Sequence, residues 1–434
     1  MLTPYPKQQE NVDRLVERFS QGSLIGLDVS KTGTGKTIVA LEVLRALGWK
    51  ALVICPKGAR TNWRLMAEEQ GVSDIILEVV NPERVRCKNT KWWNGKQWNM
   101  PANTMIIWDE VHKHCSGANT QTGKVLAMTK AWKVPVLALS ATVADSPLKM
   151  RAIGYLLGLH KYYKSSFYDW CRRNGCHSSP WHSGMDFPKG KAGLTHMQAV
   201  HDQIKDSTVC LTTNDIPEFP EGILEVNLYD LENSDIDEAT KIWKDMDLKL
   251  KSNEDIPLVE QLRVRQRLEQ FKVPIMEELT ADLLQEGNSV VVFVCFRDTL
   301  HKLKDQLQLY SWMGPVSVIH GDQSDKERNA NIDAFQANTA HVCIAMIQAG
   351  GVSINLHDVK KERPRVSLIS PSWSAVEVVQ ALGRILRAEG TKALQIFVLL
   401  AGTVEETVYR AIKRKLSNIS ALNVGLNDDD LSYV

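Results

Sequence analysis

A short glycine-bearing stretch at residues 30–37, SKTGTGKT, holds the residue types needed to bind a nucleoside triphosphate. Its glycines would let the backbone N–H groups approach the phosphates, and its lysine would reach the β- and γ-phosphates. The last threonine would place its hydroxyl on Mg²⁺. The alternative is a glycine turn that binds nothing, and Ser30 stands where such loops usually carry glycine or alanine. The residues assigned to the nucleotide or to Mg²⁺ are Gly33, Thr34, Gly35, Lys36 and Thr37.

Two adjacent carboxylates form the second candidate group. Asp109 and Glu110 directly follow an apolar run at residues 104–108, which predicts a buried strand. Asp109 would hold Mg²⁺, through water, and Glu110 would orient and deprotonate an attacking water. The alternative is an acidic turn at the surface. Residues 140–142, Ser-Ala-Thr, follow another apolar run and by themselves indicate only a tight turn.

The elements that must position these residues follow from the hydrophobic pattern. Residues 24–29 form an apolar run that predicts a buried strand, and residues 38–47 have the pattern of a helix. The loop between them would hold phosphates at a helix N-terminus, which carries partial positive charge. Further apolar runs at residues 51–55 and 136–139 alternate with helical patterns. This alternation predicts an α/β fold with a parallel sheet.

An aromatic residue and an amide precede the phosphate loop. Tyr5 and Gln8 stand at the start of an amphipathic pattern whose apolar face spans residues 12–19. The ring could stack on an adenine and the Gln8 amide could form paired hydrogen bonds to its edge. The alternative is an ordinary surface helix with a capped end.

Composition sets broad limits. The chain has 434 residues, and about 150 residues per domain predicts two or three domains. The formal net charge of +1 does not indicate a polyanion partner for the whole chain, so a nucleic-acid surface must be local. No apolar run is long enough to span a bilayer, and the first residues do not resemble a secretory signal. The eight cysteines are scattered, as in a reduced, cytosolic chain.

Two segments combine aromatic and basic residues. Residues 84–103 hold Trp92, Trp93 and Trp98 among lysines, which suits stacking on bases; the alternative is a β-hairpin whose tryptophans pack on the domain. Residues 161–199 carry six Lys or Arg, two Asp and interleaved aromatics, which suits a nucleic-acid surface.

Cysteine and histidine residues in the second segment also suggest a zinc site, although their spacing fits no common zinc pattern and an ordinary loop is the alternative. The four residues concerned are Cys171, Cys176, His177 and His182.

The motifs together resemble helicase superfamily two. Gln8, the GKT loop, LVICPK, DEVH and SAT occur in the order and spacing of that family. The second half adds AGGVSINL at residues 349–356 and QALGRILR at residues 380–387, which resemble the fifth and sixth motifs. Three details are similar to the Snf2-like branch: PKGARTNW, SPSWSAVEVVQALGR and TVEETVYRAIKRK.

The resemblance implies two RecA-like domains, each a parallel sheet flanked by helices, with a nucleotide cleft between them. The first would supply the phosphate loop, the Mg²⁺ ligand Asp109 and the base Glu110. The second would supply Arg387 and Arg384 to the γ-phosphate, where such arginines stabilise the transition state. Gly351 would let the backbone approach the nucleotide or a nucleic-acid phosphate. For Arg384 the alternative is a salt bridge on a helix surface.

The expected domains are an N-terminal RecA-like ATP-binding domain at 1–147, a helical and basic-aromatic insertion and linker at 148–285, and a C-terminal RecA-like helicase domain at 286–434. Residues 259–271 are the best helix of the linker. Leu211-Thr212-Thr213-Asn214 stands where Snf2-like proteins usually carry a pair of arginines. That departure puts in doubt any function that depends on those arginines.

The function implied is that of an ATP- and Mg²⁺-dependent DNA helicase or translocase in a bacterial or phage-infected cytosol. Its DNA could be single-stranded, duplex or branched, and short proteins of this type suggest fork or branch remodelling, as in DNA repair and recombination. A monomer would suffice, with no membrane partner. The alternatives are an RNA-directed helicase and a nucleotide-binding scaffold with little turnover.

Overall fold

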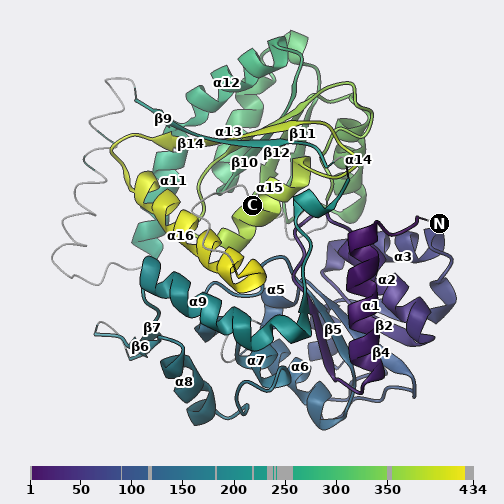
Figure 1. Ribbon diagram of the computed structural model, residues 1–434. Coiled ribbons are helices and arrows are strands. Elements are labelled where there is room, and N and C mark those ends of the chain that lie inside the picture. Colours follow the sequence, from purple (N-terminus) through teal and green to yellow (C-terminus); the bar gives the residue numbers. More distant parts are fainter. Residues whose placement is uncertain are drawn as a thin grey trace. The chain divides into compact units, whose positions relative to one another are not determined.

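The computed structural model describes residues 2–88, 90–115, 120–180, 183–217, 219–231, 238, 241, 258–348 and 354–425. Its contacts group the chain into two compact units (Figure 1). The first unit consists of Met1–Glu218 with Arg414–Val434, and the second of Phe219–Lys413. Each unit holds a parallel sheet flanked by helices, so the predicted fold class is confirmed. The three-part division at residues 147 and 285 remains a prediction.

The described strands of the first unit form a six-stranded parallel sheet in the order β3-β2-β4-β5-β1-β8. Successive residues along a strand face opposite apolar clusters: Ile106 and Trp108 belong to one, Met105 and Ile107 to the other. Burial on both faces explains the nearly continuous apolar runs. The strands are β1 Ile25–Asp28, β2 Lys50–Ile54, β3 Ile76–Val80, β4 Thr104–Asp109, β5 Val136–Leu139 and β8 Thr208–Val209.

Helices cover both faces of this sheet. Residues of α1, α2 and α3 share one apolar cluster, and residues of α6, α7, α8 and α9 share the other. A short antiparallel pair joins β6 His177–Ser178 to β7 Met185–Asp186. The helices are α1 Pro6–Ser20, α2 Lys36–Leu47, α3 Arg60–Glu69, α4 Pro82–Arg86, α5 Val111–Cys115, α6 Gln121–Ala131, α7 Arg151–Leu156, α8 Lys164–Arg173 and α9 Lys191–Ile204.

The tryptophans of residues 84–103 lie in the core, so the prediction of an exposed stacking surface there is wrong. Trp92, Trp93 and Trp98 are at most 6% exposed. Trp93 and Trp98 face each other across an antiparallel bridge, with ring centroids 5.2 Å apart. The Trp92 indole donates to Glu78 (2.8 Å), and the Trp98 indole donates to the Val125 carbonyl (3.2 Å). The hairpin alternative is confirmed.

The aromatic residues of α8 are also mainly core residues. Phe167 is fully buried and Trp170 is 3% exposed, whereas Tyr163, directly before α8, keeps 55% of its surface exposed. The Trp170 indole donates to Gln203 of α9 (3.1 Å). The prediction that the aromatic residues of this segment contact nucleic acid is therefore wrong for Phe167 and Trp170.

The described strands of the second unit form a six-stranded sheet in the order β11-β12-β10-β13-β14-β9, parallel throughout. Its strands are β9 Gly222–Tyr229, β10 Ser289–Val294, β11 Val316–Ile319, β12 Val342–Met346, β13 Arg365–Ile369 and β14 Ala393–Leu400. Its helices are α11 Leu258–Phe271, α12 Val273–Gln285, α13 Arg297–Leu307, α14 Asp325–Gln336 and α15 Ala375–Ile385. The helix predicted at residues 259–271 is confirmed as α11.

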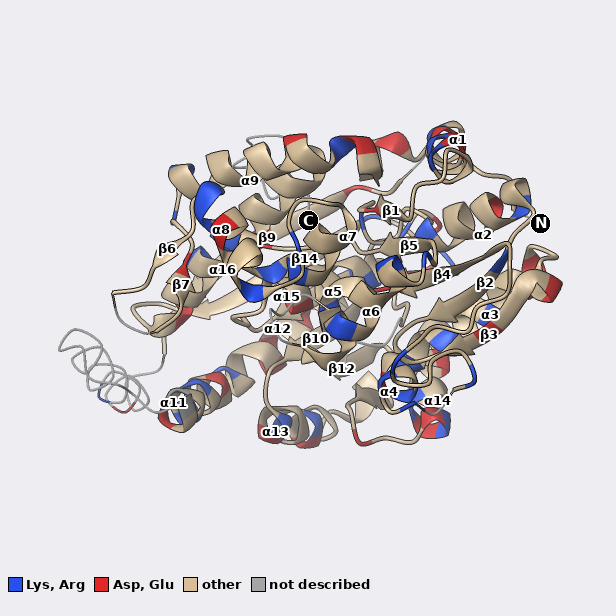
Figure 2. Cartoon of the chain, turned by 90° about the horizontal axis from the view of Figure 1, so that it is seen from below, with Lys and Arg blue, Asp and Glu red and all other residues tan. Residues whose placement is uncertain are grey.

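Both α11 and α13 carry charges of both signs (Figure 2). Neither helix offers the single-sign stripe that would mark a nucleic-acid footprint. The last helix, α16 Val404–Val424, begins in the second unit, and its residues from Arg414 onward belong to the first. None of the helices in the described chain combines the length and the apolar character that a membrane span requires.

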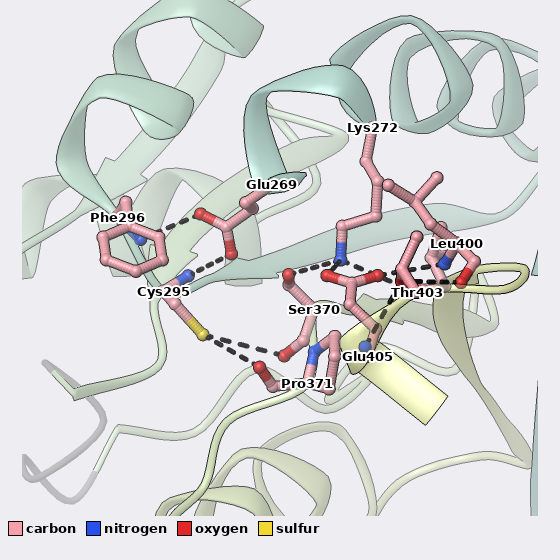
Figure 3. Close-up of polar contacts among 10 residues, drawn as sticks. Glu269, Lys272, Cys295, Phe296, Ser370, Pro371, Leu400, Thr403 and Glu405 are labelled. Atoms are coloured by element: carbon pink, nitrogen blue, oxygen red, sulfur yellow. Dashed lines mark hydrogen bonds and ion pairs between the residues drawn. The ribbon is translucent and has the colours of Figure 1, made fainter. Parts of the chain in front are cut away.

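A buried ion pair joins two helices of the second unit to its sheet (Figure 3). The ammonium of Lys272, which follows α11, lies 2.7 Å from a carboxylate oxygen of Glu405 in α16, and the Lys272 side chain is fully buried. The ammonium also donates to the Ser370 hydroxyl (2.7 Å) and to the Val398 carbonyl (3.2 Å). The second Glu405 oxygen accepts from the backbone N–H of Leu400 (3.0 Å).

Candidate active site

The candidate residues of the first unit gather at the carboxyl ends of three neighbouring strands, β4, β5 and β1. Leu139 of β5 lies in register with Asp28 of β1 on one side and with Asp109 of β4 on the other. The loops after these strands, including residues 29–35 and 140–142, therefore leave the same edge of the sheet. Ligands bind at this edge in open parallel sheets.

The phosphate loop requires glycine at two positions. Gly33 has φ +88° and Gly35 has φ +90°, in the left-handed region that other residues avoid. A Cβ atom at Gly35 would also lie 2.4 Å from the Nε2 atom of Gln8. Helix α2 begins directly afterwards, so that Lys36 and Thr37 form its first turn.

Gln8 holds this loop in place. Its side chain is 2% exposed, and its Nε2 donates to the Thr34 carbonyl (2.8 Å). Its Oε1 accepts from the backbone N–H of Tyr5 (2.8 Å). Both ends of the amide are therefore engaged within the first unit, a positioning role that the sequence did not reveal. The contact of Gln8 with an adenine remains a prediction.

The Lys36 side chain lies across the loop. Its ammonium donates to the carbonyl groups of Ser30 (2.7 Å) and Lys31 (3.0 Å). Asp28 lies beneath the loop, fully buried, and accepts from the backbone N–H of Ser30 (2.9 Å). Burial raises the pKa of Asp28, and the nearby Lys36 charge opposes that shift.

Asp109 ends β4 in a half-buried position. The Trp63 indole N–H donates to its carboxylate (2.9 Å). Burial raises the pKa of Asp109 to about 6, with a further contribution from the charge of Glu110. The hydrogen bond from Trp63 and the charge of Lys36 act in the opposite direction. In the sequence Trp63 stood out only as the last residue of the PKGARTNW stretch, which did not predict this contact with Asp109.

The donor set fits Mg²⁺. Magnesium prefers oxygen ligands, and the Asp109 carboxylate and the Thr37 hydroxyl provide them. A buried carboxyl whose pKa is raised gains from a neighbouring cation, which favours its ionised form. Bound Mg²⁺ would offset the negative charge of the phosphates.

Glu110 is placed by an unusual backbone conformation. Its φ is +50°, which is uncommon for any residue other than glycine. Its side chain retains 23% exposure, so that water can reach the carboxylate. One oxygen lies 3.3 Å from the Nδ1 atom of His112.

His112 connects the acid pair to the turn after β5. Its Nδ1 atom lies 2.7 Å from the Ser140 hydroxyl and 3.3 Å from the Thr142 hydroxyl. The backbone N–H of Thr142 donates to the same Ser140 hydroxyl (3.1 Å). The turn that seemed uninformative in the sequence is therefore part of a network that ends at Glu110.

The remaining candidates belong to the second unit. Arg384 in α15 is 5% exposed and donates to the Ile354 carbonyl (3.0 Å). A surface salt bridge, the alternative for Arg384, is therefore wrong. Arg387 follows α15, and Gly351 lies outside the described residues. The approach of these three residues to the nucleotide remains a prediction.

Comparison with known proteins shows the family to which the chain belongs. A curated protein of Acanthamoeba polyphaga mimivirus, "Putative ATP-dependent RNA helicase L364", is 31% identical in an alignment that covers 97% of this chain and 84% of that protein. The chain belongs to the same family of ATP-dependent helicases, helicase superfamily two. Two family descriptions also match this helicase: "Helicase conserved C-terminal domain" at residues 272–389 and "Type III restriction enzyme, res subunit" at residues 1–59.

Other relatives of the helicase are more distant. An Arabidopsis thaliana CHD3-type chromatin-remodeling factor is 29% identical over 33% of this chain and 12% of its own length. The Sulfolobus solfataricus SWI2/SNF2 ATPase core in complex with dsDNA is 17% identical, covers 98% of this chain and 94% of its own, and gives a TM-score of 0.38. A second structure, the Sulfolobus solfataricus SWI2/SNF2 ATPase core domain, is also 17% identical. The match covers 99% of this chain and 92% of that one, with a TM-score of 0.39.

The structure gives no support for a zinc site in the described part of the helicase. Cys171 and Cys176 form a side-chain hydrogen bond, which together with burial raises the pKa of Cys171 well above its usual range. His177 is exposed, and His182 lies outside the described residues. Within the described ranges, no group of three or more His, Cys, Asp or Glu side chains is placed to hold a metal ion.

His357 predicts a pH dependence of the second unit. Burial lowers its pKa to about 4, and the charges of Arg387 and Arg365 add to the shift. Because the unfolded chain binds this proton at about pH 6.5, the stability contributed by neutral His357 is complete above that pH and is lost as pH falls toward 4. The loss is up to about 3 kcal/mol.

Hydrogen exchange of β13 at pH 7, 5.5 and 4.5 measures this effect. The wild-type helicase should lose protection as pH falls, and a His357→Gln variant should lose less. An exposed residue, His177, provides the control variant His177→Gln, which should behave as the wild type does. Equal pH dependence in His357→Gln and the wild type would contradict the assignment.

Proposed function

We propose that this helicase is an ATP-dependent DNA translocase of the Snf2-like type that remodels forked or branched DNA. The observation that carries the proposal is the hydrogen-bonded set at one edge of the first sheet. The Lys36 loop, the Asp109–Glu110 pair and the His112–Ser140–Thr142 network occupy the ends of three adjacent strands. A scaffold with little turnover would have no need of such an arrangement.

In this proposal each residue has a separate task. Lys36 binds the phosphates, Asp109 and Thr37 hold Mg²⁺, and Glu110 accepts a proton from the attacking water. Arg387 stabilises the charge that develops on the γ-phosphate, assisted by Arg384. His112 fixes the orientation of the Glu110 carboxylate.

Support for DNA comes from the Snf2-like motifs, in particular the SPSWSAVEVVQALGR and TVEETVYRAIKRK stretches. The mimivirus relative is named an RNA helicase, which favours an RNA-directed enzyme as the second candidate. Both candidates share the same hydrolytic residues, so the nucleic acid that stimulates hydrolysis distinguishes them.

ATP hydrolysis by the purified protein should therefore be measured alone and with single-stranded DNA, linear duplex, forked DNA, four-way junctions and RNA. We expect strong stimulation by DNA, greatest with forks or junctions. Equal stimulation by plain and branched DNA would contradict branch remodelling, and stimulation by RNA alone would establish the second candidate. Turnover absent under every condition would favour the scaffold.

A further inference from the structure

The last turns of α16 form part of the first unit's core. Ala421 and Leu422 have no exposed surface and belong to the same apolar cluster as Leu27 and Trp108 of the sheet. The Leu422 carbonyl lies 2.8 Å from the Nδ1 atom of His201 in α9. This end of the helix is therefore docked on both the sheet and a helix of the first unit.

Asn423 extends this docking to the loops of the candidate active site. Its side chain is 7% exposed, and its Nδ2 donates to the Ala141 carbonyl (2.8 Å). The same Nδ2 lies 3.5 Å from the Val29 carbonyl, immediately before the phosphate loop. Five residues earlier in α16, Asn418 donates to the Asp145 carbonyl (3.1 Å). These amides thus contact the main chain after β5 and after β1.

The contact at Ala141 leads directly to the candidate base. Ala141 stands between Ser140 and Thr142, whose hydroxyls hold the His112 ring. The His112 ring lies 3.3 Å from Glu110. A shift of the Ala141 main chain would therefore move the hydroxyls that orient His112 and, through it, Glu110.

We propose that Asn423 is a positioning residue for ATP hydrolysis, and that the docked end of α16 holds the Ser140–Thr142 turn in its productive position. The inference rests on the proposed function and adds a regulatory element to the same site. Because α16 begins in the second unit, docking or undocking of its last turns can regulate hydrolysis in the first unit without contact with the nucleotide.

The variant Asn423→Asp tests this role. Aspartate keeps the size of the side chain, but it replaces the donor with an oxygen that repels the Ala141 and Val29 carbonyls. A small displacement of a catalytic group lowers turnover by about 10- to 100-fold. We expect kcat to fall within this range and KM for ATP to change by less than about twofold, since only the transition state loses an interaction.

Gln198 provides the matched control. Its Nε2 lies 3.4 Å from the Gly425 carbonyl at the same end of α16, but no contact joins it to residues 140–142 in the described chain. A Gln198→Leu variant perturbs the docked helix end alone, so its kcat should stay within about twofold of the wild type. An equal fall of kcat in both variants would show that Asn423 acts only through general packing and would overturn the inference.

Hydrogen exchange of residues 140–145 provides a readout that does not depend on turnover. Exchange there should be faster in Asn423→Asp than in the wild type or Gln198→Leu. If the wild type hydrolyses ATP and Asn423→Asp matches it in kcat, the inference fails while the proposed function stands. If the wild type hydrolyses no ATP, the proposed function fails, and unchanged exchange in Asn423→Asp overturns the inference as well.

Discussion

A Glu110→Gln variant is expected to bind ATP about as well as the wild type and to hydrolyse it about 10²- to 10⁴-fold more slowly. Glutamine preserves the length of the side chain and its contact with His112. It cannot accept a proton from water, so the loss should fall on kcat and leave the nucleotide dissociation constant nearly unchanged.

Single-turnover ATP hydrolysis and equilibrium binding of a fluorescent nucleotide would check this prediction. Lys36→Ala is the contrasting variant, because removal of the phosphate-binding ammonium should weaken binding itself. Glu69→Gln, at an exposed position in α3, is the matched control and should retain full activity. Normal turnover in Glu110→Gln would show that another group serves as the base.

The backbone at Glu110 supports this assignment. A non-glycine residue with positive φ costs about 1–3 kcal/mol and persists only where its surroundings impose it. At Glu110 the φ of +50° follows directly after β4, and Asp109 is held by the Trp63 indole on one side of the turn. His112 lies on the other side. Strain retained between two such anchors is consistent with a carboxylate that must be aimed.

The local pattern predicted the phosphate loop and the strands beside it because each depends on short-range chemistry. Gly33 and Gly35 stand where a left-handed backbone is needed, and burial on both faces makes β1 and β4 read as apolar runs. The acid pair could be assigned from its place at the end of such a run. The network around it could not, since Ser140 lies 28 residues beyond His112.

Contacts of this kind depend on strand order, which no single segment encodes. Gln8 reaches Thr34 across 26 residues, and Asn423 reaches Ala141 across 282 residues. The order that places β5 beside β4 brings Ser140 to His112. The alternation of strands and helices predicted a parallel sheet but not this order.

The prediction of a stacking surface at residues 84–103 was wrong for a different reason. Aromatic residues among lysines have the same composition whether the rings stack on bases or pack in a core. Within this segment the pair Asn94-Gly95 is typical of a hairpin turn, and Gly95 has φ +97°. With the turn fixed, Trp93 and Trp98 pair across the hairpin and both face the sheet.

The ion pair between Lys272 and Glu405 is the feature of the second unit on which a substitution should have the largest effect on stability (Figure 3). Near it, Glu269 accepts from the backbone N–H groups of Cys295 (2.7 Å) and Phe296 (2.9 Å), which follow β10. Charged groups thus hold α11 and α16 against the ends of the strands. Neither partner of the pair can turn to water without displacing a helix.

A Lys272→Met variant should therefore destabilise the second unit by about 3–5 kcal/mol, because it leaves the Glu405 carboxylate buried without its cation. Lys272→Met combined with Glu405→Leu should recover most of this loss, since replacing a whole buried pair by apolar residues is often neutral. Lys302→Met, at an exposed position in α13, is the matched control. Because two units need not unfold together, hydrogen exchange of β13 and β14 is the suitable measurement. A double variant as unstable as Lys272→Met would show that packing around the lysine stem, rather than the unpaired carboxylate, causes the loss.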